Sequence, residues 1–232
     1  MKYLILALAA VMTTVAISAP ASAAVIATTS FESPAFPALG PGQDKYGPDE
    51  SGYSSPASSA LVVPGFTFAG FSGIFSNPPI CCTPSTPYGN QFGFIQTYNN
   101  SGSSIAWAVN GLTSGDQYTL SFSDVGGSGP VGVNPLTVTF TGATPLVGNT
   151  FNPSTAGWLS NAMSFTANAG SATITFSGSP TGSNLLSGID NLVVSSVPEP
   201  ATWAMMFLGI FGLGGMLRLA RRRTGAVGAT AQ

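Results

Sequence analysis

The sequence predicts an all-β protein, an antiparallel β-sandwich, flanked by two terminal segments of different character. Three observations predict this class. Apolar and polar residues alternate over short runs, β-branched and aromatic residues fill those runs, and glycine-containing pairs separate them. Many short strands at this spacing are typical of sandwiches. The runs are residues 92–97, 104–109, 117–122, 136–141, 163–166 and 172–176.

The segment from Ala38 to Pro87 is richer in glycine, proline and serine and has weaker periodicity. We expect long loops there with one or two short strands, and no second domain. Its acidic stretch 44–50 does not have the spacing of an EF-hand loop, so we interpret it as a solvated loop. Asp116 and Asp124 stand beside glycines, where an aspartate usually bonds the backbone of a turn.

The N-terminal residues have the pattern of a secretory signal peptide. Lys2 precedes a mostly apolar stretch over 3–17, and small residues follow over 19–24. We therefore predict a signal peptide over 1–23, cleaved between Ala23 and Ala24. The alternative is an uncleaved N-terminal anchor.

The C-terminal residues predict a single transmembrane helix. Pro198 and Pro200 prevent a strand or helix interior, and the seventeen residues 201–217 that follow are uncharged, about the length needed to span a bilayer. The basic cluster 218–223 places the following tail, 224–232, in the cytoplasm. The alternative is a buried core helix followed by a basic surface patch.

This tail resembles the PEP-CTERM sorting signal of exopolysaccharide-producing Gram-negative bacteria, which would cover residues 197–223. The resemblance implies processing by an exosortase near the Pro-Glu-Pro box, after export by the secretion machinery. It also implies an inner-membrane-anchored precursor and a mature protein at the envelope surface or outside the cell. The matching residues are Pro198, Glu199, Pro200, Trp203, Ala204, Arg221, Arg222 and Arg223.

Charge is scarce in the predicted ectodomain, residues 24–196. It holds one base, Lys45, and seven acids, so its net charge is −6, whereas the whole chain carries −2. All four arginines belong to the tail. A basic surface for phosphates is absent from the ectodomain sequence, which excludes nucleic-acid binding. The chain has no histidine, which excludes Ser-His-Asp, Cys-His and zinc-histidine sites.

The two cysteines are neighbours in a proline-rich stretch. An even cysteine pair in an exported protein favours oxidation. Adjacent cysteines can form a vicinal disulfide, so Cys81 and Cys82 are candidates for one. An intermolecular bridge or free thiols are the alternatives.

The ectodomain also resembles the galactose-binding-like jelly-roll modules of carbohydrate-binding and cell-surface proteins. The resemblance rests on residues 30–32, 111–122, 157–158 and 187–194. It implies that Glu32 and Asp190 lie together around a structural calcium ion, with carbonyls and water completing the shell. Otherwise Glu32 is a solvated strand end and Asp190 caps a turn through Asn191.

Three functions are compatible with this sequence. A structural component of a biofilm or extracellular matrix needs no defined site. Weak binding of exopolysaccharide would use exposed aromatic residues, of which Trp158, Tyr98 and Tyr88 are the best candidates, whereas alternation places Trp107 in the core. We expect a structural or weakly glycan-binding protein that is not an enzyme. The alternative is a secreted glycosidase-like enzyme using paired carboxylates.

Overall fold

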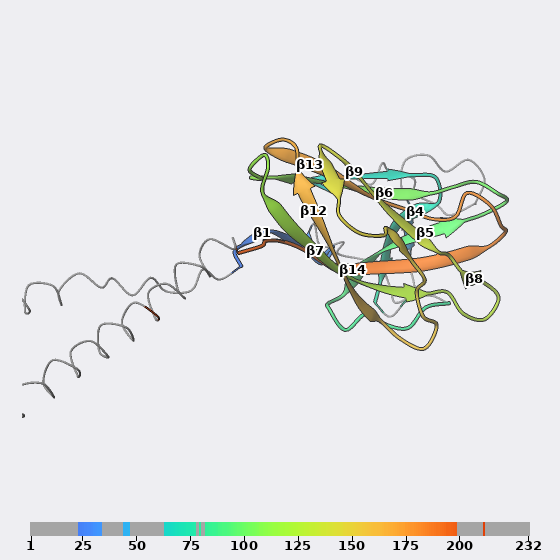
Figure 1. Ribbon diagram of the computed structural model, residues 1–232. Helices are drawn as coiled ribbons and strands as arrows, with labels where there is room; N and C mark the ends of the chain where they lie inside the picture. Colours follow the sequence, from blue (N-terminus) through green and yellow to red (C-terminus); the bar gives the residue numbers. More distant parts are fainter. Residues whose placement is uncertain are drawn as a thin grey trace, which may run out of the picture. The chain divides into compact units, whose positions relative to one another are not determined.

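The computed structural model describes residues 23–33, 44–46, 63–77, 79, 82–198 and 211 of the 232-residue chain. Residues Ala24–Val197 form one compact unit. Every regular element described in this unit is a β-strand (Figure 1). The strands are β1 (Val25–Thr29), β2 (Asp44–Tyr46), β3 (Phe66–Ala69), β4 (Ser72–Ser76), β5 (Gln91–Thr97), β6 (Ser104–Asn110), β7 (Gln117–Gly126), β8 (Gly132–Val133), β9 (Leu136–Thr141), β10 (Ala143–Pro145), β11 (Thr150–Phe151), β12 (Leu159–Ala167), β13 (Ser171–Ser177) and β14 (Leu185–Ser196).

The strands form two sheets, which confirms the predicted β-sandwich. The nine-stranded sheet has the order β10-β12-β7-β14-β5-β4-β2, and β1 and β8 also pair with β14. The five-stranded sheet has the order β11-β9-β13-β6-β3. Neighbouring strands are antiparallel, apart from the short pair of β8 with β14. Each of the six alternating runs in the sequence falls within a strand.

The last of the described strands, β14, organises the larger sheet. β7 lies along one edge of it, and its other edge pairs first with β5 and then with β1. A bulge interrupts the pairing with β7 between Asp190 and Val193, where Asn191 adopts a φ of 52°. A bulge bends the strand and changes the direction of nearby side chains. It places Asp190 at the point where β5 ends its pairing and β1 begins.

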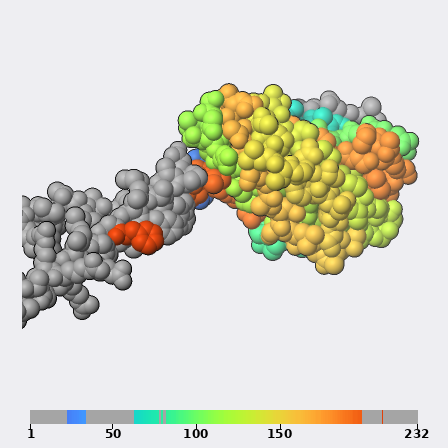
Figure 2. Space-filling model, in the orientation of Figure 1, coloured from blue at the N-terminus to red at the C-terminus, as the bar shows by residue number. Residues whose placement is uncertain are grey.

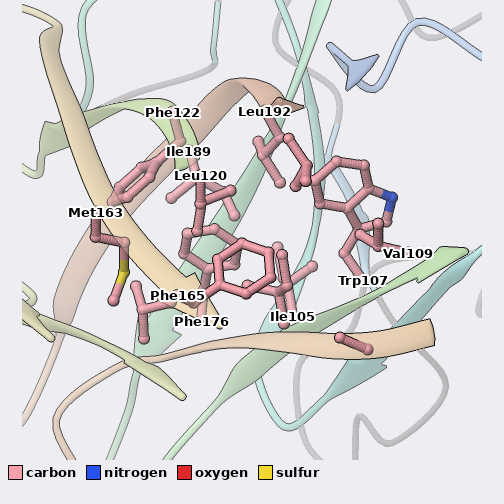
Figure 3. Close-up of a cluster of buried hydrophobic side chains, with 14 of the residues drawn as sticks. Ile105, Trp107, Val109, Leu120, Phe122, Met163, Phe165, Phe176, Ile189 and Leu192 are labelled. Carbon is pink, nitrogen blue, oxygen red and sulfur yellow. The ribbon is translucent and has the colours of Figure 1, made fainter. Parts of the chain in front are cut away.

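The main hydrophobic core lies between the two sheets. Figure 3 shows its central side chains, contributed by β6, β7, β12, β13 and β14. Phe122 makes edge-to-face contacts with Phe151 and Phe176, both at 5.0 Å between ring centroids. Trp107 is 5% exposed and stacks on Phe66, so its predicted place in the core is confirmed.

A second, smaller cluster lies on the outer face of the nine-stranded sheet. Phe92 and Phe94 of β5 alternate with Ile95 of the main core, so they point away from it. They pack with Phe75 of β4, whose ring centroid lies 4.0 Å from that of Phe94. Cys82 and Trp158 are half-buried against the same cluster. A strand buried on both faces, as β5 is, needs such a cover.

Two expectations about loops were wrong. Asp124 does not sit in a turn, because β7 continues to Gly126 and buries it within the strand. The segment 38–87 contains three short strands in its described part, β2, β3 and β4, where we expected one or two.

The yellow surface shown in Figure 2 and an exposed pair of apolar side chains both lie in the second half of the sandwich, from β9 onwards. The yellow surface in Figure 2 belongs to residues of this second half, about β9 to β11 by the colour bar. The connection after β10 exposes two apolar side chains, Leu146 and Val147.

The predictions for the two terminal segments fall largely outside the described residues. These are the signal peptide, the helix over 201–217, the basic cluster 218–223 and the tail. Phe211 is described, and its backbone is helical. Within the described part of the chain, no helix has the length and apolar character needed to cross a membrane.

Candidate functional site

Asp190, one of the two predicted calcium ligands, lies on the outer face of the nine-stranded sheet, close enough to Glu32 for the two charges to interact. Asp190 is fully buried. Its Oδ2 accepts a hydrogen bond from Thr86 Oγ1 at 2.5 Å, and its Oδ1 accepts one from the Asn191 backbone N–H at 2.7 Å. Thr86 belongs to the segment 82–90, which therefore covers the carboxylate.

Glu32 follows β1 and binds the other end of the same covering segment. Its Oε1 accepts the backbone N–H groups of Asn90 at 2.7 Å and Gln91 at 2.8 Å. Glu32 is therefore not the solvated strand end considered as the alternative, because its carboxylate holds the backbone of residues 90 and 91. The capping of Asn191 by Asp190, the other alternative, is present together with the pairing.

Burial raises the pKa of Asp190 to about 7. Hydrogen bonds from Thr86 and Asn191 act in the opposite direction, and the negative charge of Glu32 raises the pKa further. Two acids that repel each other at a buried position favour either a proton or a bound cation. The described residues hold no cluster of three or more acidic, histidine or cysteine side chains, so any cation there would rely on these two acids.

The structure brings two of the three candidate aromatic residues together beside this pair. Tyr88 and Trp158 are half-buried and meet edge to face, with ring centroids 6.3 Å apart. Trp158 Nε1 donates to the backbone oxygen of Ser85 at 2.9 Å, and Tyr88 Oη accepts from Ser123 Oγ at 2.9 Å. The indole N–H and the tyrosine hydroxyl both form hydrogen bonds within the protein. The pair therefore holds the segment 82–90 in place.

Tyr98 does not join this group. It follows β5, forms a bridge with Ser101, and contacts Phe71 at 5.4 Å between ring centroids. It precedes Asn99 and Asn100, which are exposed in a turn with positive φ.

Asp124 is a buried acid that sequence reasoning missed. It is 1% exposed, and its Oδ1 has no hydrogen-bond partner among the described residues. Burial raises its pKa to about 6, and a hydrogen bond with the Asn161 side chain opposes that change. Its cross-strand partner Ile189 belongs to the main core, so Asp124 faces the space between the sheets, unlike Asp190. No signal in the sequence separates it from a turn aspartate.

Cys82 is disulfide-bonded and has a φ of 75°. Its backbone oxygen accepts the N–H of Ser128 at 2.7 Å, which fixes the start of the segment 82–90. Cys81 lies outside the described residues, so the vicinal pairing stays a prediction.

The outer face of the five-stranded sheet is uncharged and rich in hydroxyl groups. No charged residue occurs on its strands β3, β6, β9, β11 and β13. We call this the hydroxyl face. Its outward residues are Thr67, Ala69, Ser104, Ala106, Ala108, Asn110, Thr137, Thr139, Thr141, Thr150, Ser171, Thr173, Thr175 and Ser177.

These residues stand in register across the sheet. Thr139 lies opposite Thr175, and Thr141 lies opposite Thr173. Rows are spaced about 4.8 Å between strands and about 6.8 Å along a strand. None of the threonine hydroxyls on this face bonds to another described residue. By contrast, Ser123 of β7 and Thr86 of the segment 82–90 have their hydroxyls bonded within the chain.

Residues 196–223 match the family described as the PEP-CTERM protein-sorting motif. This confirms the resemblance inferred from the Pro-Glu-Pro box, the apolar run and the arginines. The chain therefore carries the C-terminal sorting signal of an exported protein, and the signal implies processing by an exosortase. Its precursor is membrane-anchored, and its mature form belongs to the envelope surface or the exterior.

No curated protein matches the sequence. Among solved structures, a Stig cyclase from Fischerella sp. TAU, crystallised with an indole compound, has a TM-score of 0.54 at 14% identity. The alignment covers 76% of this chain and 99% of that one. An apo cyclase from Fischerella sp. has a TM-score of 0.51 at 15% identity, covering 76% and 98%. The CBM22-1 xylan-binding domain from Paenibacillus barcinonensis reaches 0.46 at 11% identity, covering 78% and 99%. The likeness to the cyclases is one of fold alone.

Proposed function

We propose that the sandwich is a non-catalytic module of the cell envelope or extracellular matrix, and that its hydroxyl face contacts neutral polysaccharide. The observation that supports it is the uncharged, in-register array of threonine and serine side chains on the five-stranded sheet. The sorting signal accounts for delivery of the module to the compartment where such polymers lie.

The chemistry of the face fits a neutral sugar polymer. A threonine hydroxyl both donates and accepts a hydrogen bond, as a sugar hydroxyl does, and the adjacent methyl group contacts C–H surface. Solvent-facing strands often carry charged residues that discourage association, and this face has none. Its edge strands are short, with two residues in β11 and four in β3, so the broad face is the larger contact surface.

The aromatic pair supports a binding site less well. Trp158 and Tyr88 direct their polar atoms to Ser85 and Ser123 within the protein. A ligand that stacked on Trp158 would compete with Tyr88 and Phe92, which already meet its ring. Tyr98 stays a separate candidate contact next to an exposed turn.

The enzyme alternative would need carboxylates open to substrate. Both oxygens of Asp190 accept hydrogen bonds from the chain, and the residue is fully buried. Asp124 is equally enclosed and lies on the opposite face of the sheet. Glycosidases place two accessible carboxyls on either side of the scissile bond. These positions favour a binding or structural role over hydrolysis.

Lysines on the hydroxyl face are expected to weaken polysaccharide binding. The double variant Thr139→Lys/Thr175→Lys adds two charges and two long side chains at directly opposed positions. We expect the full chain in non-ionic detergent to bind insoluble neutral glucan or chitin equally at low and high salt, because the contact surface carries no charge. The variant should bind at least about tenfold more weakly, about 1.4 kcal/mol. Depletion of protein from solution measures this.

The matched control is Thr119→Lys/Ser164→Lys. These residues also lie directly opposite each other on antiparallel strands, but on the outer face of the nine-stranded sheet. Binding equal to that of the unaltered chain is expected. Equal loss in both variants, or no binding to any neutral polymer, would contradict the proposal, as would binding confined to anionic alginate. Self-association lost in the face variant alone would instead assign the face to a second copy of the chain.

Calcium is expected to stabilise the protein through Glu32 and Asp190. These acids fit a cation in part, because they lie close enough to repel each other and Glu32 Oε2 has no hydrogen-bond partner among the described residues. Binding requires an ionised Asp190, so the calcium affinity should rise about tenfold between pH 6 and pH 8. The thermal midpoint in calcium and in chelator, at both pH values, measures this.

Glu32→Gln should abolish the calcium effect, and Asp116→Asn, which alters an exposed turn residue, should leave it intact. Identical midpoints in calcium and chelator at pH 8 would rule out the site.

A further inference from the structure

The end of the sandwich joins the first residue of the predicted mature chain to the first residues of the sorting signal. Ala24 N donates to Ser196 Oγ at 3.0 Å, and Ser196 N donates to the oxygen of Ala24 at 2.9 Å. Val197 N donates to the oxygen of Gln117 at 3.0 Å. The motif match begins at residue 196, so its first two residues are bonded within the sandwich.

No spacer separates this bonded end from the Pro-Glu-Pro box. Val197 is immediately followed by Pro198. Upstream, β14 is paired on both sides, with β1 over Leu192–Ser195 and with β7 as far as Ser196. A protease that takes its substrate as an extended chain needs free backbone groups, much as a peptide adds to a sheet edge. Backbone that is paired on both sides does not offer them.

We propose that β1 and Gln117 form a clamp on the end of β14, which keeps residues up to Val197 from the exosortase and confines its cut to Pro198 and beyond. Cleavage of a bonded segment tracks the population of its opened form. The exosortase also needs the residues just before its cut as free extended chain, so the opening of the Ala24–Ser196 and Gln117–Val197 contacts limits the cutting rate.

The clamp also makes C-terminal processing depend on the N-terminus. Ala24 is the residue that signal-peptide removal would place first, and this part of the inference rests on the predicted cut between Ala23 and Ala24. Correct removal leaves Ala24 able to pair with Ser196 through both its N–H and its oxygen. Folding of β1 onto β14 then defines where the mature C-terminus lies.

A flexible insertion after the clamp tests the proposal. Five residues, Gly-Ser-Gly-Ser-Gly, placed between Val197 and Pro198 leave the motif from Pro198 onwards intact and supply free backbone to the enzyme. We expect the pulse-labelled full-length chain to convert to the shortened form about 5–30 times faster. That factor corresponds to one or two hydrogen bonds that no longer have to break before cleavage. Ser196→Ala removes only the bond from Ala24 N and should accelerate conversion about fivefold.

The matched control places the same five residues between Val147 and Gly148, in an exposed connection where Gly148 has no close neighbour. Its conversion should match that of the unaltered chain. Mass spectrometry should locate the unaltered C-terminus at or after Pro198, and no variant should shorten in a strain without the exosortase. Equal rates for all chains, or an unaltered C-terminus before Pro198, would overturn the clamp. An unaltered chain that is never shortened would overturn the clamp together with the sorting assignment.

Discussion

The free energy of unfolding should fall as the pH rises from about 4 to 7. Burial raises the pKa of Asp124 to about 6 and that of Asp190 to about 7, both from 3.8. Well below pH 3.8 these carboxyls are protonated whether the chain is folded or not, so neither destabilises the fold. Between pH 4 and each raised pKa, the unfolded chain loses the proton first, which favours unfolding.

The expected loss is large. A difference of one pKa unit corresponds to 1.36 kcal/mol, so Asp190 accounts for about 4 kcal/mol and Asp124, after a discount for solvent screening, for about 2 kcal/mol. The direction is opposite to that of salt-bridged carboxylates, which lose stability in acid. Urea unfolding of the full chain in detergent and chelator, between pH 4 and pH 8, measures it.

Two variants separate the contributions. Asp124→Asn should remove the part of the slope that ends near pH 6, while Asp116→Asn, in an exposed turn, should leave the slope unchanged. Stability that is constant or that increases over this range would contradict the prediction. Calcium should oppose the loss above pH 6 if it binds at Asp190.

Replacing Asn134 by alanine should destabilise the protein by about 4 kcal/mol, because it removes the amide that bonds the buried oxygen of Ile95 and the half-buried N–H of Ser179. Asn134 is fully buried between β8 and β9. Its Nδ2 donates to the oxygen of Ile95 at 3.2 Å, and its Oδ1 accepts the N–H of Ser179 at 2.8 Å. Ile95 belongs to the larger sheet and Ser179 follows β13 of the smaller one, so this amide links the two sheets.

A loss of that size corresponds to about 10 °C in the melting midpoint of a domain this large. Asn168→Ala provides the control, because its amide bonds Thr144 on the exposed surface. That variant should lose less than about 1 kcal/mol. Similar midpoints for the two variants would show that the Asn134 amide does not join the sheets energetically.

The sequence predicts the strands well where one face is buried and the other is solvated. β6 illustrates this, since Ile105, Trp107 and Val109 point inward while Ser104, Ala106, Ala108 and Asn110, which alternate with them, are polar or small. Periodicity fails for β5, which is buried on both faces, because no local pattern shows that the segment 82–90 will cover Phe92 and Phe94. The order of the strands is likewise a property of long-range pairing.

The candidate sites also divide into features that the sequence predicts and features that it does not. The resemblance predicted that Glu32 and Asp190 lie together around calcium; in the structure the charge of Glu32 acts on Asp190, and the calcium site stays a prediction. The meeting of Tyr88 with Trp158 was not, since they come from segments seventy residues apart. The sequence wrongly indicated a turn at Asp124 because two glycines follow shortly after it. A strand that ends in Gly126 has the same local sequence pattern as a turn. The hydroxyl face emerges only when the registers of β6, β9 and β13 are known.

The central position of β14 has a consequence for the order of export. This strand pairs with β1, β5, β7 and β8, yet it is the last of the described strands. A chain that crosses the membrane from its N-terminus cannot assemble the larger sheet until residue 196 has emerged, and contacts of such long separation form slowly. The sorting signal follows immediately. The domain therefore folds at the stage of translocation at which the membrane captures the tail. It first becomes stable while it is still tethered to the membrane.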